Sequence, residues 1–395
     1  MTEHAEMIYS DEYLAYNFGN GHPFNPLRLN LTRDLIESMG VPLLAHPPRM
    51  ATKAELKTAH ASSYIEAVQQ MSITGQPSWD AARFGLGTDD DPVFLGMHEA
   101  ASLAVGGSLV AAERIVQGHS LHALNLSGGL HHAMFASASG FCLYNDVVVA
   151  VRYLRAMTGW RVLYLDIDAH HGDGVQAAFY DDPDVVTISF HETGKYLFPG
   201  SGDIRELGIG KGYGSALNIP LEPFTDDQSW LECLMAIVPP VLERFQPNII
   251  VSQHGCDGHA WDPLTDLSAT TQLFYNVAQL VHQWAHRYTE GKWLAVGGGG
   301  YELVRVVPRA WALLWMEMAG QGENERTPVP DVWRSRWQSL TSEPLPMYLV
   351  DRKSDFAPGP RARAIRDANR HTVTRLQALS ETTLYPFFAG RPAFE

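Results

Sequence analysis

Residues 166–174 read Asp166-Ile167-Asp168-Ala169-His170-His171-Gly172-Asp173-Gly174, a stretch with three carboxylates and two imidazoles within eight positions. It directly follows the apolar run 161–165, which is short and continuous and therefore predicts a buried strand of a parallel sheet. Side chains two positions apart share one face of an extended chain, so Asp168 and His170 should point the same way. Oxygen and nitrogen donors held together in this way favour a divalent metal site over a polar loop that caps a helix.

The composition excludes several classes of protein. The chain has 395 residues, of which 45% are hydrophobic, and its net charge is −15 because 44 acidic residues outnumber 29 basic ones. Since no run of Lys or Arg is present, this acidic balance argues against direct nucleic-acid binding. We see no signal peptide and no apolar stretch of about 18 residues, so no membrane partner is expected. The three cysteines, Cys142, Cys233 and Cys256, form no disulfide framework, and we expect free thiols in a soluble cytoplasmic protein.

Five apolar runs are each followed by a cluster of Gly, His or Asp residues. Besides 161–165, they occupy residues 121–126, 185–188, 248–251 and 293–296. Helical patterns separate the runs, so the chain predicts βαβ units and a mostly parallel sheet. Ligands of such sheets bind beyond the carboxyl ends of the strands, so these five strand ends should build one site.

Three helices are expected within the body of the chain, over residues 97–117, 230–245 and 273–284. Gly106-Gly107 should be a weak point of the first helix. Thr225 with Gln228 resembles a capping box that opens the second helix, and Pro239-Pro240 should break or kink it. Gly291 is placed to stop the third helix.

The chain changes character after about residue 340, where it becomes richer in Pro and Arg and carries a further helical pattern over 361–380. We see no internal repeat in the sequence. We interpret this tail as an extension and not as a second catalytic unit. We therefore expect a catalytic domain over residues 1–340 and a C-terminal extension, residues 341–395, packed on that same domain.

Asp257 follows the run 248–251 and completes a candidate ligand set with Asp168 and His170. Three protein ligands leave positions open for water and substrate, as a catalytic metal site requires. Two carboxylates and one imidazole suit zinc and also Fe(II), so the ligand types leave the ion open. A loop or helix cap remains the alternative for Asp257. Cys256 should be structural, because adjacent residues of an extended loop point apart and no second Cys is near.

A tandem pair, His131-His132, follows a Gly-Gly turn, and glycines let a backbone come close to a ligand. The pair suggests a general base and an acid or electrostatic partner for a reacting water, with two unrelated loop histidines as the alternative. A catalytic imidazole needs an acceptor at its second ring nitrogen. Asp166 and Asp173 supply two such carboxylates for the two histidines.

Tyr301 ends a run of four glycines, residues 297–300. The run lacks the Lys-Ser/Thr of a phosphate loop and the spacing of a dinucleotide fingerprint, so we reject nucleotide binding. We interpret it as a turn that places a phenol over the metal, where the phenol donates to a developing oxyanion. A half-buried core aromatic is the alternative.

Taken together, five blocks of the sequence resemble the class I histone deacetylase family, in order over roughly residues 8–320. The blocks are Gly128-Gly129-Leu130-His131-His132-Ala133, Gly140-Phe141-Cys142, Asp166 to Gly174, Phe198-Pro199-Gly200 and Gly297 to Tyr301. Three further segments resemble the bacterial acetoin-utilisation (AcuC-type) branch of this family. They are Gly85-Leu86-Gly87-Thr88-Asp89-Asp90, Ser252-Gln253-His254-Gly255 and the tail. The resemblance implies the arginase/deacetylase fold, a three-layer α/β/α arrangement around a mostly parallel sheet of about eight strands.

The activity that this resemblance implies is zinc-dependent hydrolysis of Nε-acetyl-lysine amides on proteins or peptides, with release of acetate. One zinc ion per chain would be held by Asp168, His170 and Asp257. A metal-bound water would attack the acetyl carbonyl, while His131, paired with Asp166, and His132, paired with Asp173, act as base and acid. Tyr301 would share the stabilisation of the oxyanion with zinc.

The same resemblance implies further sites around this centre. Substrate would be contacted by Gly140, Phe141, Phe198, Leu264 and Gly299, and by Asp89 or Asp90 at the substrate backbone. Core packing remains the alternative for Phe141 and Phe198. Arg28 would lie below an acetate pocket, and a structural K⁺ or Na⁺ ion would be held by Asp166, Asp168, His170 and Ser189. Leu197 departs from the aromatic side chain that relatives often have in the tunnel, which should widen the entrance.

Other functions stay open. A two-metal hydrolase of the arginase type would need carboxylates at two positions where the chain has Gly172 and His259. A deacetylase for acetylpolyamines or another small acyl amide would use the same chemistry but narrow the entrance with an inserted loop, which we do not see. An inactive acetyl-lysine binding module would have lost one of the catalytic groups. We expect the acetylated partner to be a metabolic enzyme, not a histone, and the sequence does not indicate an oligomeric state.

Overall fold

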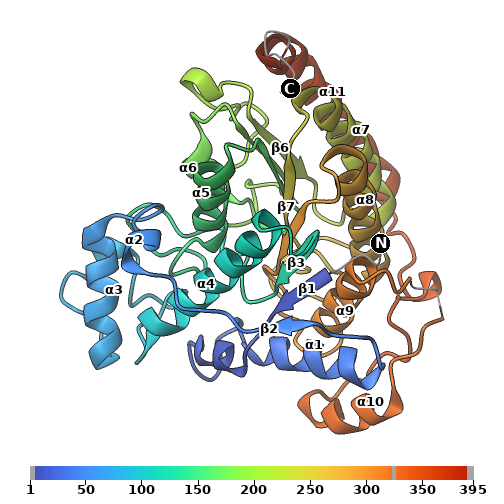
Figure 1. Cartoon of the computed structure of the whole chain (residues 1–395). Helices are drawn as coiled ribbons and strands as arrows, with labels where there is room; N and C mark the ends of the chain where they lie inside the picture. The colour runs from blue at the N-terminus through green and yellow to red at the C-terminus, as the bar shows by residue number, and fades with distance from the viewer. Residues whose placement is uncertain (1–4, 323–325, 389–395) are drawn as a thin grey trace.

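In residues 5–322 and 326–388, which the computed structural model describes, eight parallel strands form one sheet at the centre of the molecule (Figure 1). The strand order is β2-β1-β3-β8-β7-β4-β5-β6. The strands are β1 (Ala5–Ile8), β2 (Ala45–His46), β3 (His122–Asn125), β4 (Val162–Asp166), β5 (Val185–Glu192), β6 (Ala216–Leu221), β7 (Ile249–Gln253) and β8 (Trp293–Val296). The mostly parallel sheet of about eight strands that the sequence indicated is confirmed.

Helices cover both faces of the sheet and complete a three-layer α/β/α arrangement (Figure 1). One face is covered by α4 (Met97–Val116), α5 (Asp146–Thr158) and α6 (Asp173–Phe179), and α3 (Ser62–Thr74) packs on the outside of α4. The other face packs against α1 (Leu27–Ser38), α7 (Asp227–Phe245), α8 (Thr271–Tyr288), α9 (Val307–Met318) and α11 (Ala362–Phe388). Two shorter helices, α2 (Lys53–Leu56) and α10 (Asp331–Trp337), lie in connecting segments.

The central strands read as continuous apolar runs because both of their faces are covered. In β8, Trp293 and Ala295 belong to the core on the α8 side, whereas Leu294 and Val296 belong to the core on the α4 side. Strands β4, β7 and β8 are also level at their carboxyl ends, since Asp166 pairs in register with Gln253, and Gln253 with Val296. The loops that follow these ends therefore meet at one edge of the sheet.

The helix expectations were confirmed in position, but two details differ. α7 begins at Asp227, and its N-cap is Asp226, whose side chain accepts from Ser229 N, so the predicted capping box was wrong. Thr225 instead donates from Oγ1 to Glu222 O over 2.6 Å. Pro239 and Pro240 lie inside α7 without breaking it, because the buried apolar face of the helix, which packs on the sheet, outweighs the lost backbone bonds.

Gly106 and Gly107 are close-packing positions inside α4, and the helix runs through them unbroken. A Cβ at Gly106 would lie 1.6 Å from Arg49 O, and one at Gly107 would lie 2.0 Å from Tyr13 Oη. The glycines therefore let neighbouring segments approach the helix. Among the described residues, no helix combines the length and apolar character needed to cross a bilayer.

Candidate active site

The three proposed metal ligands come together beyond the carboxyl ends of β4 and β7. His170 Nδ1 lies 3.1 Å from Asp168 Oδ1 and 2.9 Å from Asp257 Oδ2. One donor atom from each of the three residues lies within 4.8 Å of the others, and all three side chains are buried. In the sequence these residues follow two different predicted strands, and His170 and Asp257 are 87 positions apart.

The two carboxylates of this ligand set need a positive charge between them. Burial alone lowers the pKa of His170, but its hydrogen bonds to Asp168 and Asp257 outweigh burial and raise the pKa to about 10. A divalent ion held by the same three donors would replace that proton and neutralise the pair. Carboxylate oxygen and imidazole nitrogen donors in this number fit zinc, and also Fe(II).

The outer oxygen of Asp168 is held by two groups whose role the sequence did not reveal. Gln253 donates from Nε2 to Asp168 Oδ2 over 2.7 Å, and Gly299 donates its backbone N–H to the same oxygen over 2.7 Å. Such contacts fix the orientation of a metal ligand. Two signals pointed to Gln253: its place in the block 252–255 that resembles the AcuC-type branch, and its position directly before the loop that carries Asp257.

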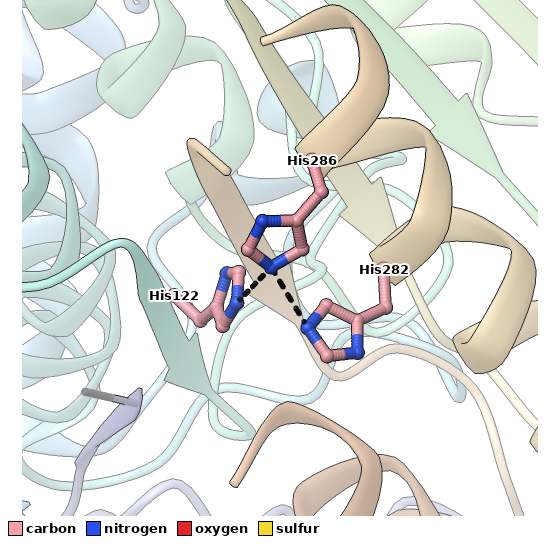
Figure 2. Close-up of side chains that lie close together, drawn as sticks. All are labelled: His122, His282 and His286. Atoms are coloured by element: carbon pink, nitrogen blue, oxygen red, sulfur yellow. Dashed lines mark hydrogen bonds between the residues drawn. The ribbon is translucent and has the colours of Figure 1, made fainter. Parts of the chain in front are cut away.

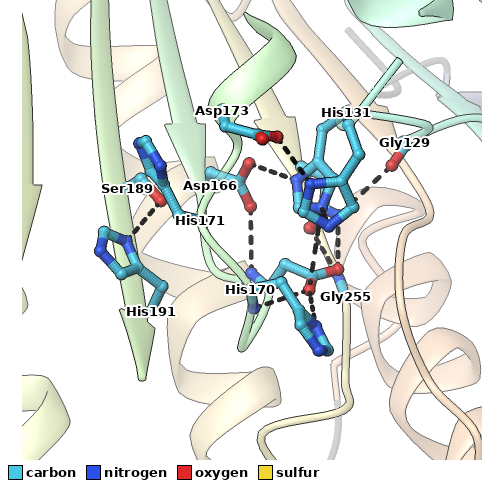
Figure 3. Close-up of polar contacts among 12 residues, drawn as sticks. Gly129, His131, Asp166, His170, His171, Asp173, Ser189, His191 and Gly255 are labelled. Atoms are coloured by element: carbon cyan, nitrogen blue, oxygen red, sulfur yellow. Dashed lines mark hydrogen bonds and ion pairs between the residues drawn. The ribbon is translucent and has the colours of Figure 1, made fainter. Parts of the chain in front are cut away.

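Behind the ligands, His131 and His132 form a hydrogen-bonded pair in which each imidazole has its own carboxylate. Figure 3 shows His131 with Asp166 and Asp173. The two Nε2 atoms lie 2.9 Å apart. His131 Nδ1 lies 2.8 Å from Asp166 Oδ2, and His132 Nδ1 lies 2.7 Å from Asp173 Oδ1. Tyr164, which sequence reasoning missed, donates its hydroxyl to Asp166 Oδ2 over 2.6 Å. The pairing is the one that the resemblance implied.

The two imidazoles differ in their affinity for a proton. Burial lowers the pKa of both, but at His131 the carboxylates of Asp166 and Asp168 outweigh burial and raise the pKa to about 9. At His132, burial and then the charge of His131 lower the pKa to about 4. Neighbouring groups whose pKa values are pushed apart supply an acid and a base at neutral pH.

Tyr301 faces the ligand set across the site. Its ring centroid lies 6.5 Å from that of His170 and 5.7 Å from that of Phe141. Its backbone N–H donates to Asp262 Oδ2 over 2.8 Å, which fixes the end of the glycine run. Burial raises the pKa of the phenol well above its ordinary value, so Tyr301 is a neutral hydrogen-bond donor at physiological pH.

A pocket of about 230 Å³ leads to these groups, and it brings together most of the predicted substrate contacts. It is lined by Asp90, His132, Gly140, Phe141, His170, Leu197, Phe198, Leu264 and Tyr301. Of the two candidate aspartates, Asp90 lines the pocket and Asp89 does not. A Cβ at Gly140 would lie 2.5 Å from His132 Cδ2 and 2.9 Å from Phe198 Cε1. The space between these side chains therefore requires glycine at position 140.

Three other predicted residues lie around the site and outside the lining of this pocket. Arg28 is buried and donates from one nitrogen to Gly298 O and Gly300 O, at 2.8 and 3.2 Å, and so supports the run that leads to Tyr301. Gly299 lies against the metal ligands. Ser189 sits beside Asp166 on the neighbouring strand, with its Oγ 2.9 Å from His191 Nδ1 (Figure 3).

The geometry also opposes a second metal ion beside the first. A Cβ at Gly172 would lie 2.4 Å from Asp166 Oδ2, so no carboxylate side chain fits there. His259 is fully buried, and its Nε2 lies 2.8 Å from Asp351 Oδ2. Neither position therefore supplies the additional ligand that a two-metal site of the arginase type would need.

Solved structures with the same fold define the class of this protein. A crystal structure of an HDAC homolog complexed with SAHA superposes with a TM-score of 0.85 and 30% identity, covering 95% of this chain and 100% of that one. A crystal structure of an HDAC homolog from Aquifex aeolicus gives a TM-score of 0.83 and 29% identity with the same coverage. Together with the site, they identify a hydrolytic deacetylase of the arginase/deacetylase fold.

The family follows from the sequence comparisons. Residues 22–318 match the Histone deacetylase domain. The chain is 48% identical to the acetoin utilization protein AcuC of Bacillus subtilis (strain 168) over 372 residues, which are 93% of this chain and 95% of that protein. It is 41% identical to AcuC of Staphylococcus aureus (strain MRSA252) over 378 residues, 95% and 97% of the two chains. The chain therefore belongs to the histone deacetylase family, as an AcuC-type deacetylase.

Proposed function

We propose that this deacetylase hydrolyses Nε-acetyl-lysine amides of proteins or peptides and that it holds one zinc ion at Asp168, His170 and Asp257. The observation that carries the proposal is the placement of His132 and Tyr301 on the wall of a narrow pocket that ends at His170. An extended acyl-lysine side chain fits such a pocket, and a proton acceptor and a proton donor then face its amide.

Zinc bound to the three donors would polarise the acetyl oxygen and make a water molecule more acidic. The remaining chemistry belongs to the chain. His132 is neutral at physiological pH, because burial and His131 lower its pKa to about 4, so its Nε2 accepts the proton of the attacking water. His131, hydrogen-bonded to Asp166, supplies positive charge next to it and helps return a proton to the lysine nitrogen.

Tyr301 stabilises the charge that develops on the acetyl oxygen. Its phenol stays protonated because burial raises its pKa, so it donates a hydrogen bond without itself changing charge. Arg28 supports this placement by holding the carbonyl oxygens of Gly298 and Gly300. The loop is therefore organised before the substrate arrives, which is what makes a donor effective in the transition state.

The rim of the pocket supports a peptide substrate. Asp90 is exposed and lines the opening, where its carboxylate accepts from the backbone N–H groups of an extended peptide. Asp89 lies outside the lining. Leu197 leaves the rim wider than an aromatic side chain would. The name of the relatives, acetoin utilization protein, favours a metabolic enzyme as the acetylated partner.

The test is acetate release from an acetyl-lysine peptide and from an acetylated diamine, each with and without chelator, with the metal content of the same preparation measured. We expect release from the peptide that stops with chelator and returns with zinc. Asp257→Ala should abolish release, whereas Asp331→Ala, at an exposed aspartate, should not. Faster release from the diamine would replace the peptide with a polyamine. Binding of the peptide without release by zinc-loaded protein would contradict the enzymatic proposal.

The compartment follows from the cysteines. Cys142, Cys233 and Cys256 are free and buried. Thiols that stay unpaired are typical of a reducing compartment, and we place the deacetylase in the cytoplasm.

A further inference from the structure

Three histidines converge at the edge of the sheet opposite to the active site (Figure 2). His122 is the first residue of β3, so it lies at the amino end of the strand, whereas the catalytic loops follow the carboxyl ends. His282 and His286 lie one turn apart near the C-terminal end of α8 and face the strand together (Figure 2). Residues four apart on a helix present two imidazoles on one face, an arrangement that proteins use to bind metals.

The distances between the three side chains fit a shared ion. His286 Nε2 lies 3.1 Å from His282 Nε2 and 3.3 Å from His122 Nε2. A tetrahedral zinc ion with Zn–N bonds of about 2.0–2.1 Å keeps its nitrogens about 3.3–3.4 Å apart. All three donor atoms lie within 4.8 Å of one another.

His282 turns its Nε2 toward the other two rings. His282 Nδ1 lies 2.8 Å from Glu317 Oε1, and in a neutral ring whose Nδ1–H donates to that carboxylate, Nε2 presents a lone pair. This Nε2 faces His286 Nε2 at 3.1 Å, so a cation between the three nitrogens would meet it directly.

The surroundings of the cluster have the features of a metal site. A carboxylate on the far nitrogen of a ligating imidazole, as Glu317 provides for His282, fixes the ring and raises its basicity. Trp293 stacks on His282 with ring centroids 5.9 Å apart and limits the access of water on that side. His286 is exposed, which gives an ion a path from solvent.

The donor type decides the class of ion. His122 is fully buried, and its Nε2 faces the other two rings. Three imidazole nitrogens suit Zn²⁺, Cu²⁺ or Ni²⁺, whereas Ca²⁺ and Mg²⁺ prefer oxygen. Among the described residues, this is the one group of three potential ligands besides the catalytic set.

We propose that His122, His282 and His286 bind a zinc-class transition-metal ion that is separate from the catalytic ion and joins β3 to α8. The ion would cross-link the C-terminal end of α8, through His282 and His286, to β3, through His122. It would raise the free energy of unfolding with the logarithm of the ratio of the free metal concentration to the dissociation constant.

The test counts metal ions in the tag-free, full-length chain, in the wild type and in variants of each site. After loading with zinc and dialysis, we expect two ions in the wild type, one in Asp257→Ala, one in His286→Ala and none in the double variant. His371→Ala, at an exposed histidine of α11, is the matched control and should keep two.

Two further measurements keep the result interpretable. In the Asp257→Ala background, added zinc should raise the melting temperature by a few degrees, and His286→Ala should remove that shift, with circular dichroism reporting on folding. Cobalt(II) in the same background should give the visible absorption bands of a tetrahedral nitrogen site. If Asp257→Ala holds no ion, or if His286→Ala leaves its ion in place, the inference is wrong. One ion in both the wild type and Asp257→Ala, lost in His286→Ala, would support this site and contradict the proposed catalytic zinc instead.

Discussion

At the scale of single residues, Tyr301 offers the sharpest test of the catalytic geometry. Tyr301→Phe removes one hydroxyl and leaves the ring packed against Phe141. We expect kcat to fall by roughly 10²–10³, because one donor to the oxyanion is lost, while the metal content stays unchanged. Steady-state kinetics with metal analysis measures both. Tyr213→Phe, at an exposed tyrosine, is the control, and wild-type turnover by Tyr301→Phe would remove Tyr301 from the mechanism.

Asp91 makes a prediction about stability and pH. It is 2% exposed, its Oδ1 has no hydrogen-bond partner, and burial together with the charge of Asp90 raises its pKa to about 8. In the unfolded chain an Asp has a pKa near 3.9, so the folded protein holds one more proton between about pH 4 and pH 8. The free energy of unfolding should therefore fall as the pH rises, by up to about 1.4 kcal/mol per pH unit.

Asp91→Asn tests this because the amide does not ionise. Urea unfolding between pH 5 and pH 8 should give a flatter profile for Asp91→Asn than for the wild type, with the variant gaining most at the alkaline end. Asp89→Asn changes an exposed residue two positions away and should follow the wild type. Parallel profiles for Asp91→Asn and the wild type would show that Asp91 is ionised in the folded protein.

At the scale of elements, the glycine run after β8 joins the metal ligands to Tyr301. A Cβ at Gly299 would lie 2.0 Å from Asp257 Oδ2 and 2.9 Å from Asp168 Oδ2, so Gly299→Ala must displace a ligand. We expect a loss of about 10²-fold in kcat/KM, which is typical when reacting groups move by about 1 Å, and the loss of one metal equivalent. Gly359→Ala, where a Cβ meets nothing within 4 Å, is the control. Unchanged kinetics in Gly299→Ala would mean that the loop adapts freely.

The sequence predicted elements well where one force dominated. β8 was located to the residue, because a covered strand needs apolar side chains on both faces and a turn on either side. β5 extends to Glu192, four residues beyond the apolar run 185–188 that predicted it, because buried polar residues such as His191 still pair with β6. α7 shows the same competition, since local proline chemistry predicted a break or a kink, and the helix, packed against the sheet, continues through both prolines.

At the scale of the whole molecule, the catalytic centre was visible in the sequence because its residues follow strand ends, and parallel strands bring their ends together. Contacts that depend on helix packing were not visible. His282 lies on the predicted helix 273–284 and His286 just beyond it, but His122 is 164 positions from His286 and lies inside a predicted strand. Only the packing of α8 on the sheet shows that the three imidazoles meet.

The packing of α11 on the body of the chain supports the prediction that the tail belongs to the catalytic domain. α11 lies against α7 and β6, with Leu376 fully buried and Val373 6% exposed. Asn369 joins the two parts by accepting from Glu222 N at 2.9 Å and donating to Thr225 Oγ1 and Ser229 Oγ at 2.8 and 3.0 Å. We propose that the residues after 340 unfold together with the body of the chain.

Asn369→Ala tests that cooperativity. The change leaves buried partners without hydrogen bonds, so the free energy of unfolding should fall by about 2–3 kcal/mol. If the tail belongs to the domain, calorimetry should show one transition at a lower temperature, because the lost contacts destabilise the whole unit. Thr374→Ala, at an exposed threonine of the same helix, should leave the melting temperature near that of the wild type. A small early transition that leaves the main one unshifted would instead make the tail an independent element resting on the deacetylase domain.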